Sequence, residues 1–169
     1  AILQRSTKNL EIIKEKPLRF IRSSSAALPQ PVLKELEKTF QCPVVEAYGM
    51  TEASHQITSN PLPPGLRKPG TVGIASGPEV KIIAENGKNL PHNGIGEIVI
   101  KGKTVINSYV NNSEANHSSF HEKWFKTGDL GCIDEEGYLK ISGRIKEIIN
   151  KGGEKISPKE IDDVLQEMP

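Results

Sequence analysis

A strand pattern, a helix pattern and a second strand pattern follow one another in the first fifty residues. Residues 18–22 form a short strand candidate, and residues 43–46 form a second one. Between them, Pro29 and Pro31 mark a helix start, because proline is favoured in the first helical turn. Apolar residues then recur at spacings of three and four as far as Phe40. This order predicts two parallel strands joined by a crossover helix, with ligand loops at their carboxyl ends.

Polar side chains follow both strand patterns at the point where each strand ends. Residues 23–25 are three serines after the first strand, and residues 48–52 (Tyr-Gly-Met-Thr-Glu) come after the second. An aromatic ring can cover a flat base, a hydroxyl can bond a phosphate oxygen, and a carboxylate can hold a hard cation. Because parallel strands end at the same edge of a sheet, the two segments can meet in one crevice. The sequence therefore predicts a site suited to ATP and magnesium.

A proline-rich break over residues 60–69 separates this part from a region of strands and turns. The later strand patterns are residues 80–84, 96–101, 130–133 and 138–141, and a short helix pattern covers residues 111–120. Turn residues separate these strands, at Asn86-Gly87 and over 134–137, as in antiparallel hairpins. We expect a small antiparallel barrel or sheet from about residue 66 to residue 143.

The last segment changes character again. Ser157 with Pro158 and Glu160 forms a capping box, and an apolar stripe follows from Ile161 to Met168. This helix has little of its own domain to pack against. Since the chain also begins without Met inside a helix-like segment, we expect it to be a piece of a longer protein.

The expected fold class is therefore α/β, divided into three parts. Residues 1–65 are predicted to be the C-terminal part of a parallel α/β subdomain. Residues 66–143 are predicted to form the antiparallel β-barrel subdomain. Residues 144–169 are predicted to contain a hinge and the start of a small, truncated C-terminal α+β domain.

Composition narrows the function classes. The 169 residues are 36% hydrophobic and 25% charged, which is typical of a globular protein. A formal net charge of +1 gives no field that would attract nucleic acid or anionic lipid. The two cysteines, Cys42 and Cys132, have no metal-ligand spacing and fit a reducing cytosol. The sequence contains neither a signal peptide nor an apolar run long enough for a membrane span.

The last hairpin brings two charged residues to one end. A tight turn at residues 134–137 predicts pairs whose numbers sum to about 271, so that Asp129 faces Ser142 and Arg144 faces Thr127. Asp129 and Arg144 then lie close together, where a carboxylate and a guanidinium can share the hydroxyls of a ribose. The alternative is a structural ion pair at the surface, which is common and weak.

Four ordered motifs now point to one family. They are residues 48–52, residues 96–98 with Gly102, residues 124–129, and residues 143–149 with 151–156. In order and spacing they resemble the adenylate-forming superfamily of acyl- and aryl-CoA synthetases, luciferases and peptide-synthetase adenylation domains. The resemblance covers nearly the whole chain and implies ATP, Mg²⁺ and CoA as ligands.

For the nucleotide, the resemblance implies that Tyr48 stacks on adenine. The backbone around Ser25, Ala26 and Ala27 would close the opposite side of the base. Thr51 would bond the α-phosphate.

The remaining assignments concern ribose, metal and CoA. The resemblance implies that Asp129 and Arg144 hold the ribose and that Glu52 is a ligand of magnesium. Lys146 corresponds to the hinge between the large and small domains, which makes Thr51, Glu52 and Lys146 the expected catalytic residues. Gly152 and Gly153 correspond to the loop that lines the CoA channel.

Each assignment has a structural alternative. Tyr48 could be a core aromatic residue, and Glu52 could be an exposed carboxylate favoured by a helix dipole. Lys146 could be a solvated strand residue. Gly152 and Gly153 could simply form a turn.

His55 indicates the acid that is activated. A histidine near the acyl pocket, beside Ser54 and Gln56, suits a polar acid rather than a fatty or aromatic one. Residues 22–26, 46–56 and 59–64 most resemble the oxalyl-CoA synthetase branch, in which Ser25 and His55 would hold the distal carboxylate of oxalate. A medium-chain or 4-coumarate-type acid is the alternative, and His55 could instead be a capping or packing residue.

The implied reaction forms an acyl-adenylate and pyrophosphate, after which the CoA thiol takes the acyl group. The superfamily's phosphate loop and its adenylation lysine lie outside this sequence, so we expect this chain alone to be inactive. A degenerate nucleotide-binding or interaction module is the alternative function. The expected partners are a small carboxylic acid, ATP and CoA, and the expected location is the cytoplasm, or a peroxisome in a eukaryote.

Overall fold

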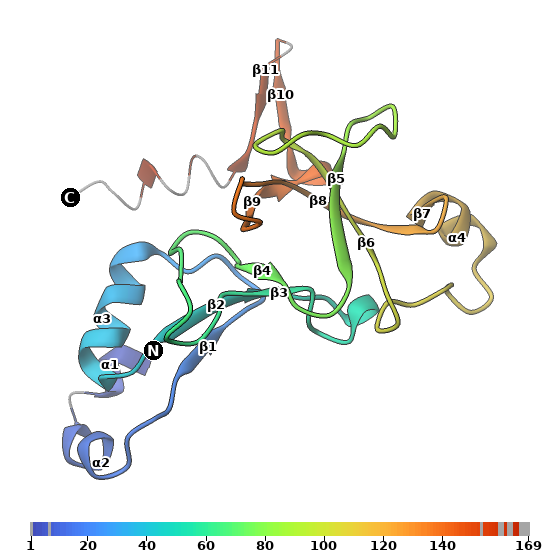
Figure 1. Cartoon of the computed structure of the whole chain (residues 1–169). Helices are drawn as coiled ribbons and strands as arrows, with labels where there is room; N and C mark the ends of the chain where they lie inside the picture. Colours follow the sequence, from blue (N-terminus) through green and yellow to red (C-terminus); the bar gives the residue numbers. More distant parts are fainter. Residues whose placement is uncertain (1, 7, 153, 159–160, 162–163, 166–169) are drawn as a thin grey trace.

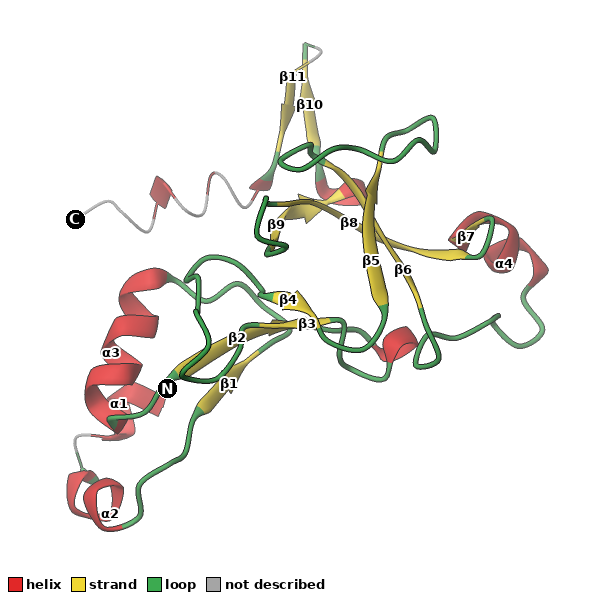
Figure 2. Ribbon diagram, viewed as in Figure 1, coloured by secondary structure: helices red, strands yellow, loops and turns green. Residues whose placement is uncertain are grey.

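The computed structural model describes residues 2–6, 8–152, 154–158, 161, 164 and 165. The described part contains a four-stranded and a five-stranded β-sheet that share one core, a separate two-stranded hairpin, and helices at the outer ends (Figure 1, Figure 2). No helix in the described ranges is both long and apolar enough to cross a bilayer. The short elements at the start of the chain are α1 (Ile2–Ser6) and α2 (Leu10–Glu15).

The first sheet has the strand order β1-β2-β3-β4. Its elements, with the helices between them, are β1 (Ile21–Ser23), α3 (Gln30–Phe40), β2 (Val44–Tyr48), the 3₁₀ turn η1 (Thr51–Ala53), β3 (Thr58–Ser59) and β4 (Ile74–Ala75). The β1 and β2 strands are parallel, which confirms the prediction from the strand–helix–strand pattern. Both later pairings are antiparallel, and β4 lies beyond the proline-rich break but pairs with β3.

Helix α3 packs on this sheet through its predicted apolar face. Leu33 and Leu36 are buried against Val44 of β2, with Val32 and Phe40 partly buried beside them. The helix ends at Phe40, and the capping residue Gln41 has a φ of 51° in the left-handed region. Amphipathic spacing therefore decided both the helix and its orientation.

The second sheet is antiparallel and has five strands in the order β5-β6-β8-β7, with β9 paired to β8. The elements of this region are β5 (Glu79–Ile83), β6 (Gly96–Lys101), α4 (Ser113–Ser119), β7 (Phe120–His121), β8 (Trp124–Ile133) and β9 (Leu139–Arg144). The predicted antiparallel region and the predicted short helix are both confirmed. The curled sheet gives the mixed α/β class that the sequence predicted.

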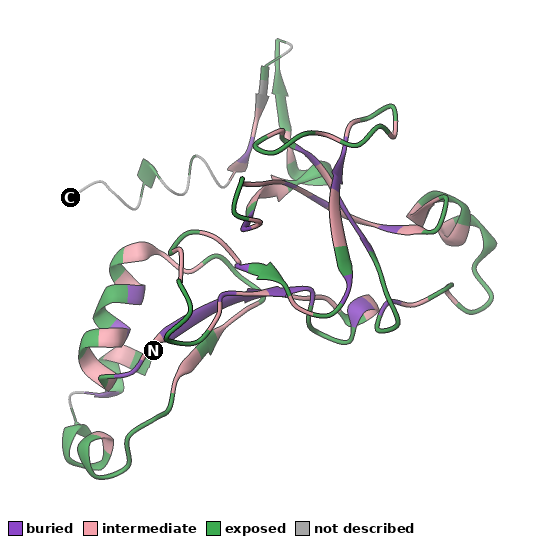
Figure 3. Cartoon of the chain, viewed as in Figure 1, coloured by how far each residue is buried: buried purple, intermediate pink, exposed green. Residues whose placement is uncertain are grey.

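One hydrophobic core joins the two sheets. Tyr48 and Ile57 from the first region pack with Ile98, Ile100 and Phe125 from the second. Every residue of β2 is buried (Figure 3). The strands β1 and β3 cover its two edges, α3 packs against Val44, and Tyr48 enters the core shared with the second sheet. The end of β2 is thereby held against the antiparallel sheet.

The predicted register of the last hairpin is wrong. Ile133 pairs with Leu139, which shifts the register by one residue, and an irregularity at Leu130/Gly131 shifts it again. As a result Asp129 is the direct partner of Arg144, rather than of Ser142. A bulge inserts an extra residue into one strand, so the position of later pairs cannot be counted from the turn alone.

After β9 the chain forms η2 (Ile145–Glu147) and the hairpin of β10 (Ile149–Lys151) and β11 (Glu154–Ile156), which projects from the rest of the chain in Figure 1. The predicted helix from Ser157 to Met168 falls largely outside the described residues.

Candidate active site

The segment after β2 makes a tight reversal. The N–H of His55 donates to the carbonyl of Met50 at 2.9 Å, and the N–H of Ile57 donates to the carbonyl of Tyr48 at 2.8 Å. A Cβ at Gly49 would lie 2.1 Å from the carbonyl oxygen of His55. Glycine is therefore required here by the close approach of backbone, and the reversal presents Thr51 and its neighbours at the end of the strand.

Tyr48 and Asp129 come together although they are far apart in the sequence. The Tyr48 hydroxyl donates to Oδ2 of Asp129 at 2.5 Å, and both residues are buried. Burial, followed by the charge of Asp129, raises the pKa of the Tyr48 hydroxyl well above its usual range. The hydroxyl therefore stays protonated and remains a donor to the carboxylate.

Arg144 reaches the same carboxylate from the neighbouring strand. Its Nε lies 3.1 Å from Oδ1 of Asp129. The Arg144 side chain is 67% exposed, whereas that of Asp129 is 8% exposed. The pair thus differs from an ordinary surface ion pair, because a buried acceptor holds a guanidinium that is mostly in solvent.

Thr127 supports Asp129 and was not among the predicted site residues. The Thr127 hydroxyl donates to the carbonyl of Ile98 at 2.8 Å, and Thr127 Oγ1 accepts the N–H of Asp129 at 3.1 Å. Thr127 lies within the predicted motif 124–129, so its place in that motif is the sequence feature that could have identified it. It anchors the backbone of Asp129 to β6.

The end of β1 lies beside the end of β2, as the register Ser23↔Glu46 requires. Ser25, with a φ of 76°, is exposed. Arg22 donates to the carbonyl oxygen of His55 at 3.3 Å. This bond ties β1 to the turn after η1, and Arg22 is a second residue without a predicted role.

Ala26 and Ala27 follow Ser25 and are also exposed. The structure therefore leaves this part of the chain open to solvent. His55 is exposed as well. Its backbone has a φ of 61° in the turn that follows η1.

Thr51 is exposed and Glu52 is half-buried on η1. The Tyr109 hydroxyl donates to Oε1 of Glu52 at 2.9 Å. Burial, and then the hydrogen bond to Glu52, raises the pKa of Tyr109, which keeps its proton on the phenol. Tyr109 was not predicted, since nothing in its spacing relates it to Glu52.

These residues fit a cation that arrives with its nucleotide. Glu52 has one oxygen bonded to Tyr109, which leaves the other for a ligand. No group of three or more His, Cys, Asp or Glu side chains in the described part could hold a metal on its own. Magnesium is commonly held by one or two carboxylates together with substrate phosphates and water, so a single carboxylate is a sufficient protein contribution.

Lys146 lies in η2, two residues after Arg144, and is exposed. Gly152 lies at the turn between β10 and β11 with a φ of 63°, where a Cβ would meet open space. Its backbone conformation favours glycine in this structure. Gly153 lies outside the described residues.

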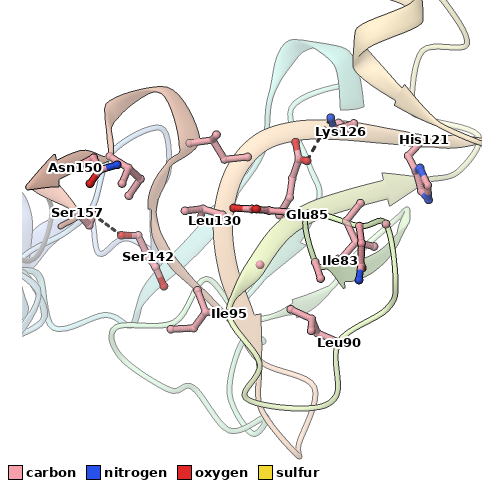
Figure 4. A pocket seen from close by; sticks show the side chains of 17 residues that line it. Ile83, Glu85, Leu90, Ile95, His121, Lys126, Leu130, Ser142, Asn150 and Ser157 are labelled. Atoms are coloured by element: carbon pink, nitrogen blue, oxygen red, sulfur yellow. Dashed lines mark hydrogen bonds and ion pairs between the residues drawn. The ribbon is translucent and has the colours of Figure 1, made fainter. Parts of the chain in front are cut away.

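A separate cavity lies apart from these residues. It has a volume of about 1170 Å³ and lies between the antiparallel sheet and the segment after β9 (Figure 4). Its apolar walls include Ile83, Leu90, Ile95 and Leu130. None of the described residues predicted to bind nucleotide lines it.

Comparison with known proteins follows the same motifs. The profile of a family described as AMP-binding enzyme matches residues 2–110. An oxalate–CoA ligase of Saccharomyces cerevisiae is 53% identical over 154 residues, which cover 90% of this chain and 28% of that protein. A sulfoacetate–CoA ligase of Cupriavidus necator is 44% identical over 153 residues, which cover 90% of this chain and 30% of that protein.

Solved structures agree in fold. The O-succinylbenzoate coenzyme A synthetase of Bacillus subtilis, in complex with ATP and magnesium ion, superposes with a TM-score of 0.78 at 31% identity. The match covers 98% of this chain and 38% of that chain. This chain therefore spans well under half the length of the proteins that it matches.

Proposed function

This chain belongs to the family of AMP-binding enzymes, and we propose that the whole protein is an ATP-dependent acyl-CoA synthetase. The membership confirms the resemblance seen in the sequence motifs. In the proposed reaction the carboxylate of an acid attacks the α-phosphate of ATP, which gives an acyl-adenylate and pyrophosphate. The CoA thiol then takes the acyl group, and AMP leaves. The observation that carries the proposal is the convergence of Tyr48, Asp129 and Arg144 from three strands.

Asp129 and Arg144 are the proposed ribose contacts. A carboxylate has about four lone-pair positions, and Tyr48 and Arg144 use two of those of Asp129. Two hydroxyl groups of a ribose could therefore still donate to it. Arg144 engages Asp129 through Nε, so its exposed terminal nitrogens are available to donate to a ligand.

The adenine would lie between Tyr48 and the backbone of Ser25, Ala26 and Ala27. Tyr48 is only 8% exposed, so in this conformation it acts through its hydroxyl on Asp129. Stacking on the base requires a face of the ring to become accessible when the nucleotide binds.

Thr51 and Glu52 are the proposed contacts to phosphate and Mg²⁺. When bound, Mg²⁺ would neutralise phosphate charge during attack by the carboxylate. Thr51 is exposed at the start of η1 and can donate its hydroxyl to a phosphate oxygen. Glu52 is held in the same turn and directs a carboxylate oxygen to the cation.

The second half of the proposal concerns domain movement. Lys146 is the proposed hinge, and Gly152 and Gly153 are proposed to line the CoA channel after rotation of a small domain. Rotation would let one pocket serve both steps of the reaction. The exposed position of Lys146 directly after β9 supports a hinge there, because few contacts would have to break.

Oxalate is the proposed acid. Ser25 and His55 are exposed polar residues, and Arg22 ties the backbone of His55 to β1. The two relatives compared above are named for oxalate and sulfoacetate, which are both short acids with a second acidic group. Medium-chain and 4-coumarate-type acids are the alternatives, and a catalytically dead nucleotide-binding module is the alternative of another class.

Release of pyrophosphate by the whole protein tests the enzymatic proposal. With MgATP and a panel of oxalate, octanoate and 4-coumarate, release is expected with oxalate. If the whole protein releases no pyrophosphate with any of these acids or with other short acids, the proposed enzymatic function is contradicted. The nucleotide-binding module then remains as the function. The chain as given is expected to release none, because the resemblance implies that adenylation also needs a phosphate loop and a lysine outside this sequence.

The oxalate assignment is tested by His55→Ala. We expect the rate with oxalate to fall about 10–100-fold, since a charge-assisted hydrogen bond contributes about 1.5–3 kcal/mol. His117 on α4 is exposed like His55, so His117→Ala is the matched control and should leave the rate unchanged. A preference for octanoate or coumarate that His55→Ala does not alter would exclude oxalate.

A further inference from the structure

The segment after β6 contacts the η1 turn at three points. The Ser54 hydroxyl donates to the carbonyl of Thr104 at 3.1 Å, and the N–H of Ile106 donates to the carbonyl of Glu52 at 2.9 Å. The third contact is the Tyr109 hydroxyl on Oε1 of Glu52, at 2.9 Å. Residues 104–109 therefore hold both the backbone and the carboxylate of Glu52.

Tyr109 is itself held firmly. The side-chain amide of Asn116 accepts the N–H of Tyr109 at 2.6 Å and donates to its carbonyl at 2.9 Å. The ring packs against Phe125, with centroids 6.3 Å apart, and Phe125 is 2% exposed. A residue fixed through its backbone and its ring can aim its hydroxyl in one direction only.

We propose that Tyr109 is a positioning residue for Glu52, and that Asn116 supports it from α4. The hydroxyl occupies Oε1, and Oε2 has no partner among the described residues. Tyr109 thereby presents Oε2 to the divalent cation that accompanies ATP. The inference rests on the proposed function, because it requires Glu52 to be the metal ligand.

The chemistry favours positioning over simple structural support. Carboxylates that bind metals are themselves held by hydrogen bonds, and loss of such a partner typically reduces metal affinity or activity by about 10–100-fold. Tyr138 offers the contrast, since its hydroxyl donates to the backbone carbonyl of Leu66 at 2.6 Å. That bond joins two loops and reaches no side chain with a proposed ligand.

Binding of Mn²⁺ tests the proposal without a catalytic assay. Electron paramagnetic resonance would follow Mn²⁺ binding to the whole protein in the presence of a non-hydrolysable ATP analogue. Tyr109→Phe is expected to raise the Mn²⁺ dissociation constant about tenfold or more, and Asn116→Ala is expected to raise it by a smaller factor. Tyr138→Phe, the matched control, should bind Mn²⁺ like the unmodified protein.

Kinetics provide a second measurement. In Tyr109→Phe the loss of pyrophosphate release should be largely restored by high Mg²⁺, because the carboxylate remains present but is no longer oriented. The midpoint of thermal unfolding of Tyr109→Phe should change no more than that of Tyr138→Phe, which would show that Tyr109→Phe is folded.

Three results would overturn the proposal. Mn²⁺ affinity in Tyr109→Phe within twofold of the unmodified protein would exclude positioning. Equal losses in Tyr109→Phe and Tyr138→Phe would show a general structural effect. Failure of the unmodified protein to bind Mn²⁺ with the nucleotide analogue would refute the proposed function and this inference with it.

Discussion

The β8–β9 hairpin carries an aspartate at each end, and the two differ in what holds them. Asp134 lies at the turn and pairs with Lys68, while Asp129 lies at the open end and pairs with Arg144. The residue type and the charge of the partner are the same in both pairs. The difference lies in the neighbouring groups: those around Asp134 stabilise a turn, whereas those around Asp129 leave it able to accept hydrogen bonds from a ligand.

Asp134 is satisfied by its own turn. Its Oδ1 accepts the N–H groups of Glu136 at 3.0 Å and Tyr138 at 2.8 Å, and its Oδ2 lies 2.7 Å from Lys68. The hydrogen bond from Lys68 is the largest cause that lowers the pKa of Asp134. Since two donors are backbone groups of the same turn, no ligand could displace them without unfolding it.

Asp129 is held by side chains from two other strands. Tyr48 approaches from the core and Arg144 approaches from solvent. An exposed arginine with five N–H donors can keep its bond to Asp129 and still reach a ligand. Burial of the acceptor with exposure of its partner is therefore the feature that distinguishes the candidate site from a structural ion pair.

The largest expected effect is on nucleotide binding by Asp129→Asn. The whole protein should bind AMP about 10–100-fold more weakly, because hydrogen bonds to a charged group contribute about 1.5–3 kcal/mol. Titration calorimetry would measure the dissociation constant. Asp134→Asn is the matched control. A similar loss of AMP affinity in that variant would contradict the proposal that only Asp129, at the open end of the β8–β9 hairpin, contacts the nucleotide.

Removal of Asp134 should act on stability instead. Asp134→Ala is expected to reduce the free energy of unfolding of this chain by about 1–3 kcal/mol, because two backbone N–H groups lose their acceptor. Urea unfolding measures this, with the exposed neighbour Glu135 changed to Ala as control. Equal midpoints for Asp134→Ala and Glu135→Ala would contradict the structural role of Asp134.

A smaller effect is expected from Tyr48→Phe. Asp129 keeps Arg144 in this variant, so AMP affinity should fall only about three- to fivefold, in line with a single net hydrogen bond of about 0.5–1.5 kcal/mol. Fluorescence titration with an AMP analogue would measure it. An effect as large as that of Asp129→Asn would mean that Tyr48 contacts the nucleotide through more than this bond.

The smallest effect concerns acid stability. A carboxyl whose folded pKa is lowered contributes stability above its unfolded pKa and loses it as pH falls through the folded pKa. For Asp134 this window begins near the ordinary value of 3.8 and extends below it. Unfolding between pH 5 and pH 2 should therefore be less pH-dependent in Lys68→Met than in the unmodified chain, and identical profiles would argue against this pairing.

The sequence predicted local structure well where periodicity and turn residues agree. The amphipathic spacing before Phe40 located α3, and the parallel pairing of β1 and β2 followed from it. Tyr48, Asp129 and Arg144 were named from ordered motifs, and the structure brings their side chains together. Their role toward a nucleotide stays a prediction. These predictions use only residues that are close together in the chain, and the sequence alone shows which residues those are.

The register and the supporting residues could not be predicted. The irregularity at Leu130/Gly131 moved Arg144 opposite Asp129, and no turn signal indicates such a shift. The bonds from Arg22 to His55 and from Tyr109 to Glu52 join residues 33 and 57 positions apart. Such contacts depend on how separate elements pack against one another. The periodicity of apolar residues in the sequence does not contain that information.

By itself, the sequence determined the order of strands and helices, the family motifs and the carboxylates available for a ligand. Only the tertiary structure decided how those groups are held: Asp129 is buried and bonded to Tyr48, and Glu52 is bonded to Tyr109. Short-range periodicity sets the elements, since it acts between residues a few positions apart. The environment of a carboxylate depends on which distant side chains the shared core brings to it.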